Sequence, residues 1–163
     1  MKQLLIIWHS TTGGTQQMAQ AAAEAAAAES GTQTHMLRAV AARPDDVLAA
    51  DGYIFATPEN LAAMAGIMKD FFDRCYYPAL GRIEGRPYAS LICAGSDGEN
   101  AARQIARIAT GWRLRPMAEP LIIRTGAQTP EAILAPKTIP PTQLTRCAEL
   151  GLSLATGLAM GVF

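Results

Sequence analysis

The chain has 163 residues, half of them hydrophobic and 17% charged, which is the size and apolar content of one domain with its own core. The 14 basic and 14 acidic residues leave no net charge. Nucleic-acid binding is therefore not expected, because it needs a clustered positive excess, and neither is docking on basic partners through an acidic face. The low charge and high apolar content also exclude a disordered chain.

The three cysteines, Cys75, Cys93 and Cys147, form neither a CxxC pair nor an even-numbered set. We therefore expect no disulfide framework, no metal site and a reducing, cytoplasmic setting. The apolar run 4–8 is too short for a signal peptide, and the apolar tail 150–163 is shorter than the ~20 residues of a spanning helix. The sequence thus predicts a single domain over residues 1–163 that does not bind a membrane.

Short apolar runs alternate with helical patterns along the chain. In chain order, we expect a strand at 4–8, a helix at 15–29, a strand at 32–38, a helix at 44–50, a strand at 52–56, a helix at 60–76, a strand at 88–94, a helix at 98–110, a strand at 121–123, a proline-rich surface loop at 125–141 and a helix at 142–159. The helix 60–76 has the clearest pattern, an apolar face that begins at Leu61.

Five strands that alternate with helices predict an α/β fold, in which a doubly wound parallel sheet carries helices on both faces. Ligands of such sheets bind at the carboxyl ends of the strands. The loops after the first, third and fourth strands are therefore the candidate site.

The loop after the first strand, residues 9–15, reads His-Ser-Thr-Thr-Gly-Gly-Thr and opens a helix. Its hydroxyls, its paired glycines and the free amides of a helix N-terminus favour a phosphate site made of hydrogen bonds alone, since the loop holds no Lys or Arg. It lacks the Gly-Lys-Ser/Thr of a P-loop and the GxGxxG of dinucleotide sites. The alternative is a polar turn in which Thr15 only caps the helix.

Three motifs carry a family resemblance. Ser10, Thr12, Gly13 and Thr15 match the Ser/Thr-x-Thr-Gly-x-Thr phosphate loop of flavodoxins. Thr57-Pro58, Met64-x-Gly66-x-Met68 and Phe71-x-Asp73 resemble the second flavin loop and following helix of flavodoxin-like reductases. Among these are the NAD(P)H:quinone oxidoreductases of the tryptophan-repressor-binding-protein type and the NADPH-dependent FMN reductases. Residues 94–100, Ala-Gly-Ser-Asp-Gly-Glu-Asn, resemble their third flavin loop, although Asp97 and Glu99 equally suit a helix start.

The resemblance implies a flavodoxin-like fold with strand order 2-1-3-4-5, FMN as cofactor, NADPH or NADH as co-substrate, a quinone or similar small acceptor, and a homo-oligomer, either a dimer or a tetramer. The family's ring-stacking aromatic falls near Leu61. The residues that the resemblance places at the cofactor are Ser10, Thr11, Thr12, Gly13, Gly14, Thr15, Thr57, Pro58, Glu59, Asn60, Leu61, Ala94, Gly95, Ser96, Asp97 and Gly98.

The preferred function is an FMN-dependent NAD(P)H oxidoreductase, in which the flavin carries the chemistry and no catalytic side chain is required. The alternatives are a flavodoxin-type electron carrier without its own substrate and an interaction module that binds FMN poorly. His9 is interpreted as structural rather than as a phosphate contact, and Cys93 as a small buried hydrophobe. Arg103 and Arg107 either form a solvated face or meet the phosphates of a nicotinamide nucleotide.

Overall fold

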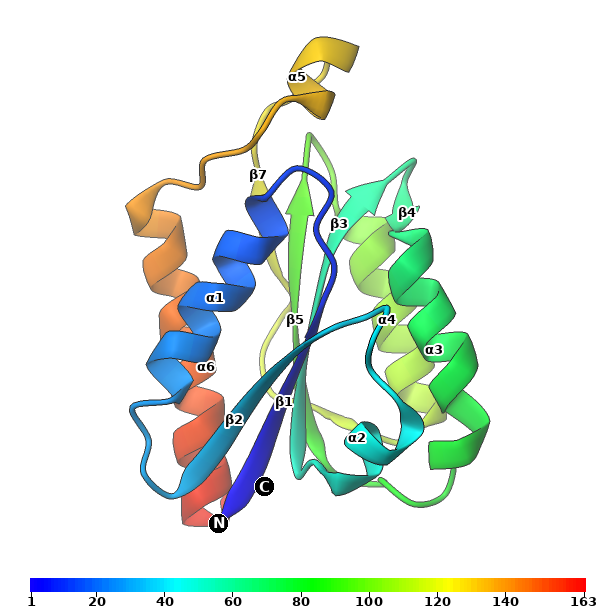
Figure 1. Ribbon diagram of the computed structural model, residues 1–163, viewed down its shortest axis with the longest axis vertical. Helices are drawn as coiled ribbons and strands as arrows, with labels where there is room; N and C mark the ends of the chain where they lie inside the picture. Colours follow the sequence, from blue (N-terminus) through cyan, green and yellow to red (C-terminus); the bar gives the residue numbers. More distant parts are fainter.

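The computed structural model describes residues 1–163 as a sheet between two layers of helices (Figure 1). Its elements are β1 (Lys2–Trp8), α1 (Gly14–Ala26), β2 (Thr32–Arg38), α2 (Pro44–Ala49), β3 (Gly52–Asn60), β4 (Ala63–Met64), α3 (Gly66–Ala79), β5 (Pro87–Ala94), α4 (Glu99–Gly111), β6 (Arg115–Pro116), β7 (Leu121–Arg124), α5 (Pro130–Leu134) and α6 (Pro141–Met160).

The five main strands are parallel and lie in the order β2-β1-β3-β5-β7, while the two-residue β6 pairs with the first residues of β5. This is the predicted order 2-1-3-4-5, so the doubly wound flavodoxin-like sheet is confirmed. The central strands are apolar on both faces because helices cover both, and every residue of β5 is buried.

Each face of the sheet has its own core. Helices α1 and α6 cover one face, and α2, α3 and α4 cover the other (Figure 1). The second layer packs aromatic side chains such as Phe55, Phe72 and Trp112. The core under the first layer is aliphatic, and a Cβ at Gly151 of α6 would collide with the carbonyl of Ala22 in α1. The alanine-rich tract of α1 therefore serves close helix packing.

The predicted helix 60–76 is wrong in its first six residues. There β3 continues to Asn60, turns at Leu61 and Ala62, and pairs back antiparallel through β4, so that α3 begins only at Gly66. Leu61 and Ala62 have left-handed backbone angles, with φ of 50° and 61°. The amide of Met64 donates to Gln104 Oε1 at 2.9 Å and holds the short hairpin against α4. Met64 of β4 and Met68 of α3 are both buried. Their spacing of four residues therefore resembled a helix face although Met64 lies in a strand.

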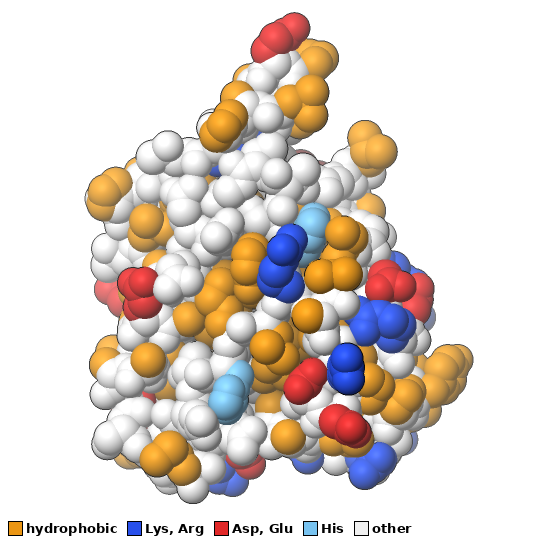
Figure 2. Space-filling view, in the orientation of Figure 1, with side chains coloured by type: hydrophobic (Ala, Val, Ile, Leu, Met, Phe, Trp, Pro, Cys, Tyr) orange, Lys and Arg blue, Asp and Glu red, His pale blue; other side chains and the backbone are white.

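The region 125–141, predicted as a surface loop, contains the short helix α5 and crosses above the carboxyl ends of the strands (Figure 1). In the space-filling view this projecting segment carries hydrophobic side chains (Figure 2), and Ile133 and Leu134 are its exposed apolar residues. Helix α1 also ends at Ala26, three residues earlier than predicted.

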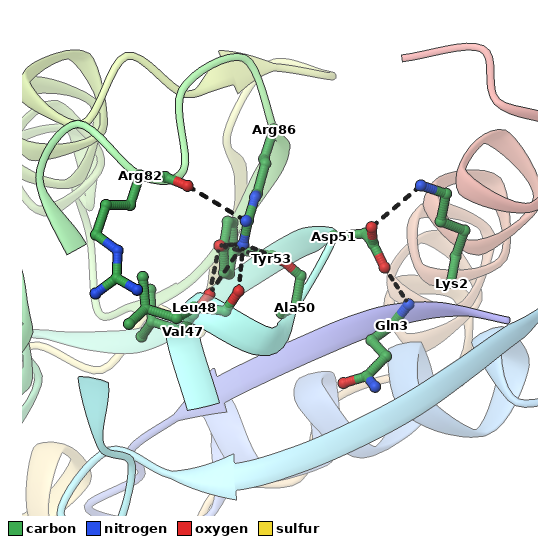
Figure 3. A network of polar contacts seen from close by, with 9 residues as sticks. All are labelled: Lys2, Gln3, Val47, Leu48, Ala50, Asp51, Tyr53, Arg82 and Arg86. Atoms are coloured by element: carbon green, nitrogen blue, oxygen red, sulfur yellow. Dashed lines mark hydrogen bonds and ion pairs between the residues drawn. The ribbon is translucent and has the colours of Figure 1, made fainter. Parts of the chain in front are cut away.

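At the opposite end of the sheet, Arg86 closes the C-terminus of α2 (Figure 3). Its Nη1 donates to the carbonyl oxygens of Leu48, at 2.8 Å, and Ala50, and to the hydroxyl of Tyr53 at 3.1 Å. A cation is favourable at the carbonyl end of a helix, so this network stabilises the C-terminus of α2, at the end of the sheet opposite the candidate site. No helix in the chain combines the length and apolar character needed to cross a bilayer.

Candidate functional site

A cleft of about 470 Å³ opens at the carboxyl ends of the strands, a size typical of small-molecule sites. It brings the three predicted loops together with the segment that follows β7. Its lining residues are Ser10, Thr11, Thr12, Gly14, Thr15, Pro58, Glu59, Asn60, Leu61, Cys93, Ala94, Gly95, Ser96, Thr125, Ala127, Ile133, Leu134 and Lys137. Of the predicted site residues, Gly13, Thr57, Asp97 and Gly98 do not line the cleft.

The first wall of the cleft is the N-terminus of α1. Gly13 caps the helix with a φ of 95°, a conformation that favours glycine, and no side chain caps the first turn. The first turn holds no acidic residue, so the amides and the positive end of the helix dipole remain available to an anion. Ser10 Oγ accepts a hydrogen bond from the Gly13 amide at 3.0 Å, which leaves its own proton free to donate.

Thr15 is the strongest indication of a ligand in this wall. Its side chain is only 1% exposed, and its hydroxyl has no hydrogen-bond partner in the protein. A buried hydroxyl left unsatisfied costs about 1–3 kcal/mol, so such groups are rare. Because Thr15 lines the cleft beside the free amides of α1, an anionic oxygen in the cleft would satisfy it. The residues present therefore fit a phosphate group.

The first wall of the cleft is not uncharged, contrary to the prediction from loop 9–15. The ammonium group of Lys137 lies 3.4 Å from Thr12 Oγ1 and donates to the carbonyl oxygens of Ile133 and Ala135 at 2.8 and 2.6 Å. The Lys137 amide also donates to the Thr12 carbonyl at 2.8 Å. A cation thus reaches the loop from a segment 125 residues away in the sequence.

Gln17 holds that segment in place. Its Nε2 donates to the Lys137 carbonyl at 2.7 Å, and its Oε1 accepts from the Ile139 amide at 2.9 Å. Lys137 was not predicted from the sequence because no local pattern links it to the loop. The one available signal was a lone lysine in a long connection between two elements, where functional residues are common.

The second wall is the β3–β4 hairpin. Thr57 is fully buried and supports the hairpin from below, because its hydroxyl accepts from the Ala65 amide at 3.1 Å and donates to the Pro58 carbonyl at 3.0 Å. Leu61 stands at the hairpin tip and is completely exposed, so its side chain is free to cover a flat ligand. Glu59 Oε2 accepts from the Gly98 amide at 2.8 Å and ties this wall to the next.

The third wall is the loop between β5 and α4. Gly98 again has a φ of 95°, and a Cβ on it would lie 2.6 Å from Ile122. The Gly98 and Glu99 amides are taken by the carboxylates of Glu59 and Asp97, at 2.8 and 3.3 Å. The amides of Ser96 and Asp97 have no acceptor within the protein and remain available to a ligand.

Cys93 forms part of the cleft floor and is 8% exposed. A Cβ on Gly14 would lie 2.6 Å from its sulfur, so glycine at 14 lets α1 approach β5 closely. Burial raises the pKa of the Cys93 thiol, and the charge of Lys137 opposes that shift only in part. A raised pKa favours the protonated thiol at neutral pH, which is in keeping with the interpretation of Cys93 as a small hydrophobe. His9 does not line the cleft; burial, and then the charge of Arg38, lower its pKa.

The fold and the cleft define a protein of the flavodoxin-like class. An archaeal flavodoxin superposes with a TM-score of 0.78 at 18% identity, over 96% of this chain and 98% of that one. A flavodoxin, WrbA-like protein from Agrobacterium tumefaciens gives a TM-score of 0.71 at 15% identity, over 98% and 99% of the two chains. At this identity the two structures establish the fold alone.

The profile of the NADPH-dependent FMN reductases matches residues 29–128, so the chain belongs to that family. A flavodoxin from Aquifex aeolicus is 33% identical over 60% of this chain and 53% of its own length. An NAD(P)H dehydrogenase (quinone) from Acidithiobacillus ferrooxidans is 35% identical over 45% of this chain and 47% of its own length. These matches span about half the length of each relative.

Proposed function

We propose that the protein binds FMN in the cleft and acts as an NAD(P)H-dependent oxidoreductase that reduces a quinone or a similar small acceptor. The observation that carries the proposal is the Thr15 hydroxyl, buried without a partner among the free amides of α1. Membership in the FMN reductase family and the likeness to a quinone dehydrogenase support it. Bound FMN would supply the redox chemistry, a two-electron transfer from the nicotinamide to the acceptor.

The chain's own residues would hold the cofactor by its two ends. The hydroxyls of Ser10, Thr12 and Thr15, with the first amides of α1, would donate to the phosphate, and Lys137 would add a charge-assisted hydrogen bond.

The ring would lie between the hairpin and the loop after β5. Pro58 and Leu61 offer apolar surface from one side, and Ile133 and Leu134 from the segment above. The Ser96 amide, which has no acceptor within the protein, would donate to the edge of the ring where negative charge develops on reduction. No side chain in the cleft is required to transfer a proton to the substrate.

The test is a flavin titration followed by turnover. We expect the purified protein to take up FMN in a one-to-one ratio and then to oxidise NAD(P)H continuously when a quinone is present. A protein that fails to bind FMN would refute the proposal. Uptake of FMN without turnover would favour the second candidate, a single-electron carrier, which the 33% identity to a flavodoxin supports.

The remaining expectations are proposals of the same kind. Limited proteolysis would test whether residues 1–163 form a single FMN-binding domain. Light scattering would test for a homo-oligomer of two or four copies, and cell fractionation would test the cytoplasmic location.

A further inference from the structure

A second hollow, of about 400 Å³, lies on the other side of the β3–β4 hairpin from the cleft. Met64 of β4 and Ile108 of α4 give it apolar surface. Its other lining residues are polar or basic: Lys69, Asn100, Arg103, Gln104 and Arg107. No acidic side chain lines it, although the chain as a whole is neutral.

Two of the three cations in this hollow are uncompensated. Lys69 is paired with Asp73 at 2.6 Å, whereas neither Arg103 nor Arg107 takes part in any ion pair. The two arginines lie one turn apart on α4, so their side chains share one face of the helix. A guanidinium group matches the geometry of a phosphate, to which it can donate two parallel hydrogen bonds.

The hairpin contributes lining residues to both the hollow and the cleft. Glu59 and Met64 face each other across the hairpin, and Glu59 lines the cleft while Met64 lines the hollow. Opposite residues of an antiparallel pair have Cα atoms about 5 Å apart. A single extended ligand that crosses the tip at Leu61 could therefore occupy both sites.

The hairpin is also fixed to α4, which carries the arginines. Gln104 Oε1 accepts from the Met64 amide at 2.9 Å, and Asn100 Nδ2 donates to the Ala62 carbonyl at 2.6 Å. The distance between the arginines and the cleft is thus set by direct hydrogen bonds rather than by a mobile loop.

We propose that this basic hollow binds the phosphate groups of the nicotinamide dinucleotide whose nicotinamide ring enters the cleft. The inference rests on the proposed function and adds the site that recognises the co-substrate. The apolar floor suits the adenosine portion, and the arginines suit either the pyrophosphate or a 2′-phosphate.

The test is calorimetric titration of NADP⁺ and NAD⁺ into the FMN-saturated protein and into the protein without added FMN. The variant is Arg103→Gln with Arg107→Gln. The matched control is Arg82→Gln with Arg146→Gln, which removes two positive charges elsewhere on the surface. We expect the Kd for NADP⁺ to rise about tenfold in the first variant, the order expected from losing one charge-assisted hydrogen bond, and to stay unchanged in the control. The KM for NADPH should rise in parallel while kcat is retained.

The two nucleotides distinguish the phosphate involved. Weaker binding of NADP⁺ alone assigns the arginines to the 2′-phosphate, and equal weakening of both nucleotides assigns them to the pyrophosphate. Unchanged affinity for both, or the same loss in the control, would overturn the proposal. A protein that never binds FMN but still loses NADP⁺ affinity with the arginines would refute the proposed function and leave this site standing.

Discussion

Replacing Thr15 by valine should stabilise the protein without FMN and at the same time weaken its binding of FMN. Valine has the shape of threonine, so the substitution changes the hydroxyl and little else. That hydroxyl is buried and has no partner, and removing it should return part of the 1–3 kcal/mol that an unsatisfied polar group costs. For a chain of this size, each kcal/mol raises Tm by about 3 °C.

The effect on FMN has the opposite sign. If the hydroxyl donates to the phosphate, its loss removes a hydrogen bond to a charged group, which is worth about 1.5–3 kcal/mol. The Kd for FMN should then rise between about 10-fold and 150-fold. Thermal unfolding with and without FMN measures both effects, since the gain in Tm on adding FMN should shrink in the variant.

Thr34 of β2 provides the matched control, because its hydroxyl is the only other buried side-chain oxygen without a partner. Thr34 lies outside the cleft, so Thr34→Val should stabilise the FMN-free protein and leave the Kd for FMN unchanged. The reasoning fails if Thr15→Val lowers the Tm of the FMN-free protein, or if it binds FMN as tightly as the unchanged protein does.

Three further predictions follow from the same structure. Lys137→Gln should weaken FMN binding several-fold and make the Kd for FMN less sensitive to salt. Fluorescence titrations at low and high ionic strength would detect both effects. If the Kd of the variant depends on salt as strongly as that of the unchanged protein, the lysine does not have this role. Changing Leu61 and Ala62 to Asn-Gly should raise the free energy of unfolding by about 1–2 kcal/mol in denaturant titration, because both residues have positive φ; no gain would mean that the hairpin tip is unstrained. Burial raises the pKa values of Cys75 and Cys147 to about 11, so above pH 9 the folded state keeps thiol protons that the unfolded state loses. The free energy of unfolding should therefore fall by up to about 1.4 kcal/mol per pH unit for each of the two cysteines. Alanine at both positions should flatten this slope.

The sequence predicted most of the sheet because its strands are buried on both faces. Runs such as Leu4–Trp8 and Tyr88–Ala94 are apolar without alternation, and the helices between them force parallel pairing and a doubly wound order. The loops at the carboxyl ends followed from that topology. Most of the residues predicted there do line one cleft.

The features that the sequence did not predict depend on contacts between distant segments. The two central residues of the hairpin turn, Leu61 and Ala62, are not the Asn or Gly that signal a tight turn, and the hairpin is held by Gln104, about 40 residues away. Lys137 reaches the loop 9–15 because its segment is bonded to Gln17 of α1 and to the Thr12 carbonyl. Periodicity and motif spacing are local quantities, so neither contact could be read from them.

The contact between Gly151 and Ala22 has a mechanical consequence for the cleft. Since the two helices approach backbone to backbone at this point, a displacement of α6 would also displace α1, whose N-terminal turn forms the first wall of the cleft. A larger residue at 151 would have to push α1 sideways along its whole length. A substitution on the side of the molecule opposite the cleft would then change the position of the amides in the first wall, in addition to its cost in stability.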